Sequence, residues 1–161
     1  MTIGFILNGE DVVIQSEANV RLIDILRFNF GLFGAKAGCL TGKCGFCAVI
    51  FNGYISHACL IPAFRVRGSE VITIEGFSQT DEFHDIMTGF TQANVKNCGY
   101  CETSKILNAG ALLERIKRPS RQEILIAFNG IKCRCTDPEQ LVDAIEKTVT
   151  IRQRRLYGRS A

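Results

Sequence analysis

The chain has 161 residues, 47% hydrophobic and 22% charged, which is typical of a globular protein with one or two small domains. The net charge of +3 is far below the excess expected of a nucleic-acid-binding protein. No apolar run approaches the roughly 20 residues that cross a bilayer, which excludes an integral membrane protein. The first eight residues lack the features of a signal peptide, so we expect a reducing, cytoplasmic location.

The N-terminal part of the sequence predicts a small α+β domain over residues 1–77. A short helix is expected over residues 20–28, with Asn19 as its N-cap. The dipeptide Asn52-Gly53 is a strong hairpin signal between two apolar runs. Strands are expected over residues 2–7, 11–15, 48–51, 54–55 and 71–75. Several strands around one helix indicate an α+β domain.

After residue 77 the apolar residues follow the period of a helix, which predicts a four-helix bundle over residues 78–161. Ser120 and Glu123 form a capping box, and Asp137 precedes a proline at the first position of the last helix. The helices are expected over residues 78–95, 101–117, 120–129 and from 137 past 145. The basic end of the chain is predicted to be a solvated tail, with a docking tail as the alternative, and carries Arg152, Arg154, Arg155 and Arg159.

Eight cysteines fall into two groups of four. The first group has the spacing C-x4-C-x2-C-x11-C and consists of Cys39, Cys44, Cys47 and Cys59. Disulfides are disfavoured in a reducing cytoplasm, and structural zinc sites use two separated short knuckles rather than three ligands in one loop. The spacing matches that of plant-type [2Fe–2S] proteins, and the loop has glycines directly beside two of its cysteines, Cys39 and Cys44. The first group therefore predicts a [2Fe–2S] site.

The second group has the spacing C-x2-C-x31-C-x-C and consists of Cys98, Cys101, Cys133 and Cys135. Taken alone, this spacing suits zinc about as well as an iron–sulfur cluster. Because the same chain also contains a plant-type loop, a second iron–sulfur cluster is favoured over zinc. The predicted helices place the first pair at one helix start and the second pair before another, where the helix dipole favours an anionic group.

With both groups in this order, the chain resembles the small iron–sulfur subunits of the molybdenum hydroxylases, a family that includes xanthine, nicotinate, carbon monoxide and aldehyde dehydrogenases or oxidoreductases. The resemblance runs from about Ile3 to Ile145. The motifs that carry it are Ala35-Lys36-Ala37-Gly38-Cys39, Gly42-Lys43-Cys44-Gly45-Phe46-Cys47, Cys98-Gly99-Tyr100-Cys101 and Cys133-Arg134-Cys135-Thr136.

The resemblance implies a β-grasp ferredoxin domain followed by a four-helix domain, each holding one [2Fe–2S] cluster. It implies an electron-transfer subunit without a substrate site, which receives electrons from a large molybdopterin-binding subunit and passes them to a subunit that binds FAD. A higher oligomer of that complex is a further expectation. The family usually has glutamine before its third motif, where the side chain meets the pterin, and the matching residue here is Asn97.

The sequence departs from the family pattern around the second group. Glu102-Thr103-Ser104 stands where the family has Thr-Pro-Gly, and Lys132 and Asp137 also differ from the usual residues. Two other functions fit the residues: a zinc-stapled adaptor, and a stand-alone ferredoxin with an additional helical domain. The substrate and the final electron acceptor are properties of other chains.

Overall fold

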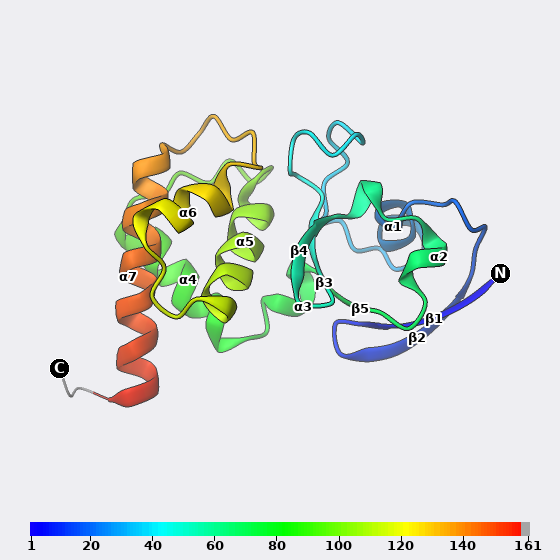
Figure 1. The fold of residues 1–161 in the computed structure, drawn as a ribbon, viewed down its shortest axis with the longest axis horizontal. Helices are drawn as coiled ribbons and strands as arrows, with labels where there is room; N and C mark the ends of the chain where they lie inside the picture. The colour runs from blue at the N-terminus through cyan, green and yellow to red at the C-terminus, as the bar shows by residue number, and fades with distance from the viewer. Residues whose placement is uncertain (159–161) are drawn as a thin grey trace.

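The computed structural model describes residues 1–158 and shows a mixed β-sheet beside a group of helices (Figure 1). The sheet has five strands in the order β2-β1-β5-β3-β4. β1 and β5 are parallel, and the other neighbouring strands are antiparallel. The strands are β1 (Thr2–Leu7), β2 (Glu10–Gln15), β3 (Ala48–Phe51), β4 (Tyr54–His57) and β5 (Glu70–Ile72).

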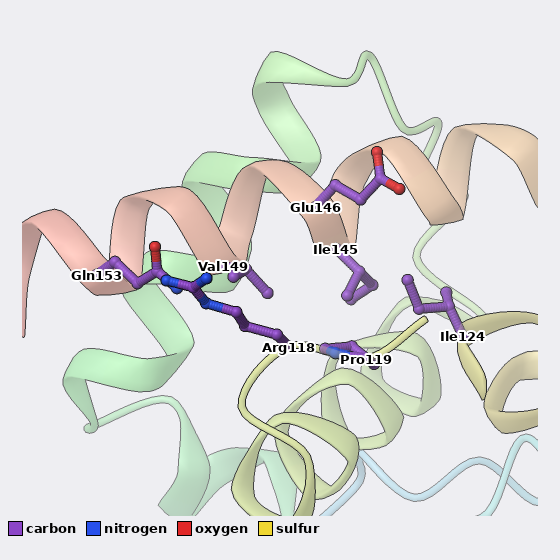
Figure 2. Close-up of a pocket in the computed structure, with 7 residues that line it drawn as sticks. All are labelled: Arg118, Pro119, Ile124, Ile145, Glu146, Val149 and Gln153. Carbon is purple, nitrogen blue, oxygen red and sulfur yellow. The ribbon is translucent and has the colours of Figure 1, made fainter. Parts of the chain in front are cut away.

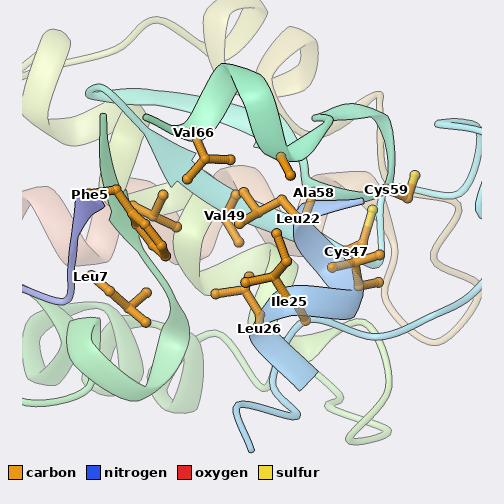
Figure 3. Packing of buried hydrophobic residues seen from close by; sticks show 14 of the residues in the cluster. Phe5, Leu7, Leu22, Ile25, Leu26, Cys47, Val49, Ala58, Cys59 and Val66 are labelled. Atoms are coloured by element: carbon orange, nitrogen blue, oxygen red, sulfur yellow. The ribbon is translucent and has the colours of Figure 1, made fainter. Parts of the chain in front are cut away.

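One face of the sheet packs against short helices to form the first hydrophobic core (Figure 3). Leu22, Ile25 and Leu26 contribute the helical side of this core, and Phe5 and Val49 contribute the strand side. The helical segments around this sheet are α1 (Leu22–Asp24), the π-helix η1 (Ile25–Asn29), the 3-10 helix η2 (Ala58–Leu60) and α2 (Ala63–Val66). A mixed sheet with helical cover on one face is the expected β-grasp arrangement.

The predicted helix over residues 20–28 begins later and has a different form. Arg21 rather than Asn19 is its N-cap, no side chain caps it, and its second half is the π-helix η1. Two short helices, α2 and α3 (Ile74–Phe77), were not expected from the sequence. Segments of four residues carry too little periodic signal to be distinguished from loops or strand ends.

The helical part consists of four longer helices with a second hydrophobic core between them. Ser120 caps one helix through a capping box with Glu123, and Asp137 caps the last through a capping box with Gln140. The four are α4 (Asp81–Gln92), α5 (Glu102–Arg115), α6 (Arg121–Phe128) and α7 (Pro138–Tyr157). Ile50 on β3 belongs to this second core, whereas its neighbour Val49 belongs to the first. Strand β3, which lies between β5 and β4, is therefore buried on both faces.

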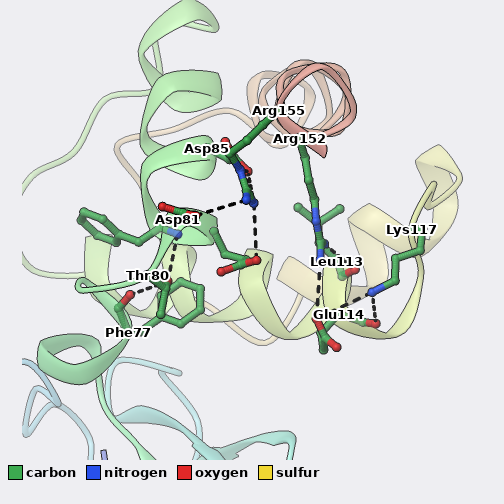
Figure 4. A network of polar contacts seen from close by, with 11 residues as sticks. Phe77, Thr80, Asp81, Asp85, Leu113, Glu114, Lys117, Arg152 and Arg155 are labelled. Atoms are coloured by element: carbon green, nitrogen blue, oxygen red, sulfur yellow. Dashed lines mark hydrogen bonds and ion pairs between the residues drawn. The ribbon is translucent and has the colours of Figure 1, made fainter. Parts of the chain in front are cut away.

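The basic end of the chain is part of α7 as far as residue 157 and is therefore not a tail; Arg154 is solvent-exposed as expected, whereas Arg152 and Arg155 have partners within the fold (Figure 4). The Arg155 guanidinium lies 2.8 Å from the buried Asp85 carboxylate of α4, and its other contacts are acidic groups of the same helix. Arg152 donates a hydrogen bond of 2.9 Å to the Leu113 carbonyl oxygen. Arg159 lies outside the described residues.

A pocket of about 310 Å³ lies between α7 and the segment that joins α5 to α6 (Figure 2). Its walls include the side chains of Arg118, Ile145 and Gln153, and none of its lining residues is a cysteine. Over residues 1–158, none of the helices combines the length and the apolar character needed to traverse a bilayer.

Candidate iron–sulfur sites

The β3–β4 hairpin positions two cysteines of the first group. Cys47 directly precedes β3, and Cys59 follows β4 within η2. Ala48 pairs with His57 in the hairpin, and the Ala58 N–H donates a hydrogen bond of 3.0 Å to the Cys47 carbonyl oxygen. Both cysteines are 3% exposed, at the border of the first core (Figure 3). Burial, together with the nearby Cys59, raises the pKa of Cys47 to about 12.

The other two cysteines of this group lie on the loop before β3. The backbone N–H groups of Thr41, Lys43 and Cys44 point at the Cys39 sulfur, with N–Sγ distances of 3.2–3.4 Å. Hydrogen bonds from Thr41, followed by that from the Cys44 backbone, lower the pKa of Cys39 to about 5. These donors favour the thiolate form of Cys39, and they are of the kind that stabilise sulfur ligands of iron–sulfur clusters.

The tight course of this loop requires glycine at particular positions. Gly42 has φ +74° and Gly45 has φ +79°, in the region that side chains rarely adopt. A Cβ atom at Gly38 would lie 2.8 Å from the Cys44 sulfur. With side chains at these positions, the loop backbone could not lie this close to the sulfur atoms of its own cysteines.

The second group brings four sulfur atoms together at the ends of helices. Cys98 and Cys101 lie at the start of α5, and Cys133 and Cys135 lie between α6 and α7. The Cys101 Sγ atom is 3.4 Å from that of Cys133, 3.7 Å from that of Cys135 and 3.9 Å from that of Cys98. These separations are far longer than a disulfide bond of about 2.05 Å, and all eight cysteines are free.

Each group has four free thiols, and three of the second group meet the geometry of a metal site, namely Cys98, Cys101 and Cys135. Burial raises the pKa of Cys101, and hydrogen bonding to Cys133 adds to the effect. A buried thiol with a raised pKa becomes a thiolate when a metal ion coordinates it, which is how such a residue acts as a ligand. The chemistry of both donor sets therefore suits a thiolate-ligated iron–sulfur cluster, and the second set also has converging sulfur atoms.

A lysine that the sequence analysis did not single out lies beside the second group. Lys105 is fully buried on α5, one helical turn after Cys101. Its ammonium group donates hydrogen bonds to the Lys96 carbonyl oxygen at 3.0 Å and to Thr136 Oγ1 at 2.9 Å, and lies 3.9 Å from Cys135 Sγ. The spacing of four residues from a cysteine at a helix start was the available signal, because it places both on one helix face.

The two cysteine groups are joined by a direct contact between the domains. The Lys132 N–H donates a hydrogen bond of 2.9 Å to the Cys44 carbonyl oxygen. Cys44 belongs to the first group, and Lys132 directly precedes Cys133 of the second. A Cβ atom at Gly45 would lie 2.4 Å from the Gly130 carbonyl oxygen, so the backbones meet without room for a side chain.

Aromatic and polar contacts support the same junction. The Tyr100 ring meets the Phe46 ring edge to face, with centroids 5.1 Å apart. Thr103 Oγ1 donates a hydrogen bond of 2.9 Å to the Gly34 carbonyl oxygen. Asn97 is exposed beside Cys98, which is exposed as well. The edge of the second group that carries Asn97 is therefore open to a partner.

Comparisons with known proteins agree with this picture. The model of a family described as a [2Fe-2S] binding domain matches residues 73–146. The chain is 42% identical over 136 residues to the nicotinate dehydrogenase small FeS subunit of Eubacterium barkeri, covering 84% of this chain and 87% of that one. The crystal structure of quinoline 2-oxidoreductase from Pseudomonas putida 86 superimposes with a TM-score of 0.86 at 32% identity, over 98% of both chains.

A further relative combines this part with much more protein. The chain is 35% identical over 142 residues to the aldehyde oxidoreductase of Megalodesulfovibrio gigas, covering 86% of this chain but only 16% of that one. The same two-part module thus occurs both as a separate small chain and as one part of a long chain.

Proposed function

Because this chain belongs to the iron–sulfur subunits of the molybdenum hydroxylases, we propose that it is the electron-transfer subunit between a molybdopterin-binding partner and a partner that binds FAD. When bound, a [2Fe–2S] cluster accepts and releases one electron at a time. The observation that carries the proposal is the pair of four-cysteine sets, joined by the hydrogen bond from Lys132 to the Cys44 carbonyl oxygen.

We assign the ligands of the two clusters by domain. The β-grasp cluster would be held by Cys39, Cys44, Cys47 and Cys59. The helical-domain cluster would be held by Cys98, Cys101, Cys133 and Cys135. The short sulfur–sulfur distances of the second set and the backbone donors around Cys39 support this assignment. The domain division at residues 1–77 and 78–161 is part of the proposal. It is supported by two hydrophobic cores, of which the second also takes in Ile50 and Phe77 where the two parts meet.

The residues around the two sets have distinct roles in this proposal. Backbone N–H groups of the loop stabilise negative charge on Cys39, and the first core excludes water from Cys47 and Cys59. The exposed Asn97 presents its amide at the open edge of the helical-domain set, where it would contact the molybdopterin of the large subunit. Eight thiols that serve as ligands require a reducing compartment, which supports a cytoplasmic location.

Metal analysis of the full-length chain tests the ligand assignment. Anaerobically purified protein should contain roughly four iron atoms and four acid-labile sulfides per chain, with negligible zinc, because eight thiolates match two four-cysteine clusters. Two zinc ions without labile sulfide would refute it. Molybdenum and flavin should co-purify with the native complex, and a native chain that purifies alone would favour a stand-alone ferredoxin.

Two matched variants test whether the cysteines divide as assigned. Cys44→Ser and Cys101→Ser should each remove a different electron paramagnetic resonance signal of the dithionite-reduced protein, because the ligand sets lie in different domains. Each variant serves as the control for the other. Loss of both signals from either variant would contradict two separate sites.

A further inference from the structure

Lys105 is the one lysine or arginine within residues 1–158 that is fully buried. It extends from α5 toward the loop that carries Cys133 and Cys135, and its place on the helix is one turn beyond Cys101. The other basic residues near this loop, Lys132 and Arg134, are exposed. Solvent and salt screen exposed charges strongly, whereas a buried charge acts on its neighbours with little screening.

The surroundings of Lys105 are built for an ammonium group. An ammonium has three donors and no acceptor, and three acceptor atoms surround this one. They are the Lys96 carbonyl oxygen at 3.0 Å, Thr136 Oγ1 at 2.9 Å and Cys135 Sγ at 3.9 Å. Thr136 donates its own hydroxyl proton to the Lys96 carbonyl oxygen at 2.7 Å, so its oxygen is free to accept from Lys105.

The charge that balances Lys105 is not a carboxylate. Among the ion pairs found in the described part of the chain, none includes Lys105. A buried cation without a counter-charge is strongly unfavourable. The available negative charge is that of the four-thiolate site, whose net charge would be about −2 when a [2Fe–2S] cluster is oxidised and about −3 after reduction.

We propose that Lys105 is a buried counter-charge that raises the reduction potential of the helical-domain site. The inference rests on the ligand assignment made above. Reduction adds one electron, supplied by dithionite in a titration and by the molybdenum-containing partner in the complex. No bond forms or breaks. A fixed positive charge stabilises the more negative, reduced state most, so the equilibrium shifts toward reduction.

A redox titration of the full-length chain, followed by paramagnetic resonance, tests this role. Lys105→Met and Lys105→Gln remove the charge, Lys105→Arg keeps it, and Lys117→Met removes an exposed charge beyond the end of α5. We expect both neutral variants to shift the reduction equilibrium of the helical-domain site at least tenfold toward the oxidised state, or about 59 mV for one electron. The β-grasp site is the internal reference and should keep its potential, as should both sites in Lys117→Met.

The remaining outcomes separate charge from packing. If the neutral variants lose about half of the iron while Lys105→Arg retains it, the charge is needed to hold the cluster, and the inference stands. An unchanged or raised potential in the neutral variants would overturn it, as would loss of the cluster from Lys105→Arg as well. Wild-type protein without iron would instead refute the ligand assignment itself.

Discussion

Replacing Gly45 by alanine should loosen the junction between the two cysteine groups. The new Cβ would lie 2.4 Å from the Gly130 carbonyl oxygen and 3.0 Å from the Ile131 Cα, and both are backbone atoms that a side-chain rotation cannot move. The residue also has φ +79°, which costs about 1–2 kcal/mol for a residue other than glycine. The backbone clash should add about 1–3 kcal/mol of overpacking to the loss of stability.

Gly99→Ala is the matched control for this change. Gly99 has φ +77° and also adjoins a predicted ligand, yet a Cβ atom there would meet no atom within 4 Å. Both variants carry the backbone cost, and only Gly45→Ala carries the clash. In a chain of this size, 1 kcal/mol lowers the melting temperature by roughly 2–4 °C, so Gly45→Ala should melt several degrees below Gly99→Ala.

Anaerobic thermal unfolding measures the stability difference, and rapid kinetics measure the exchange of electrons between the two sites. Separation of the backbones would break the hydrogen bond from Lys132 to the Cys44 carbonyl oxygen, so electron exchange should slow in Gly45→Ala alone. Iron content should stay the same in both variants, because no assigned ligand is altered. Equal melting temperatures and equal exchange rates would show that the domains do not meet closely at Gly45.

Three further changes test other parts of the structure. Arg155→Ala should lower the free energy of unfolding by about 2–3 kcal/mol, because it leaves the buried Asp85 carboxylate without its partner. Arg154 is exposed, so Arg154→Ala should change the free energy of unfolding little. Equal effects of the two variants in denaturant titrations would contradict this. Asn97→Ala should leave the melting temperature and iron content unchanged but slow the reduction of the chain by substrate in the assembled complex. An unaffected rate would show that the Asn97 amide does not contact the pterin. Glu102→Gln should raise the reduction potential of the helical-domain site by tens of millivolts, because a half-buried carboxylate next to Cys101 disfavours added negative charge. A lower melting temperature without a change in potential would show that Glu102 instead stabilises the start of the helix.

The cysteine spacing could indicate the candidate ligands because it is local information. Cys39, Cys44 and Cys47 lie within one loop, and the Asn52-Gly53 hairpin is short enough to place Cys59 beside Cys47. The capping box at Ser120 was predictable for the same reason, since its two residues are three positions apart.

Features that depend on distant parts of the chain were not predictable in this way. Lys105 is buried because Lys96 and Thr136 reach it from other segments, and a lysine in a helical pattern otherwise indicates a solvated face. Arg155 belongs to a folded helix because Asp85, 70 residues earlier, accepts its hydrogen bond. No local sequence pattern predicts either interaction.

The uneven burial of the β-grasp cysteines bears on how its cofactor would be damaged and repaired. Cys47 and Cys59 lie against the hydrophobic core and are fixed by the sheet, whereas Cys39 is exposed on a loop. In the proposed site, oxidants and chelators would reach the loop side first, and loss of iron would begin there. The sheet would keep the other two ligands in place, so a damaged protein would retain half of the site as a template for rebuilding.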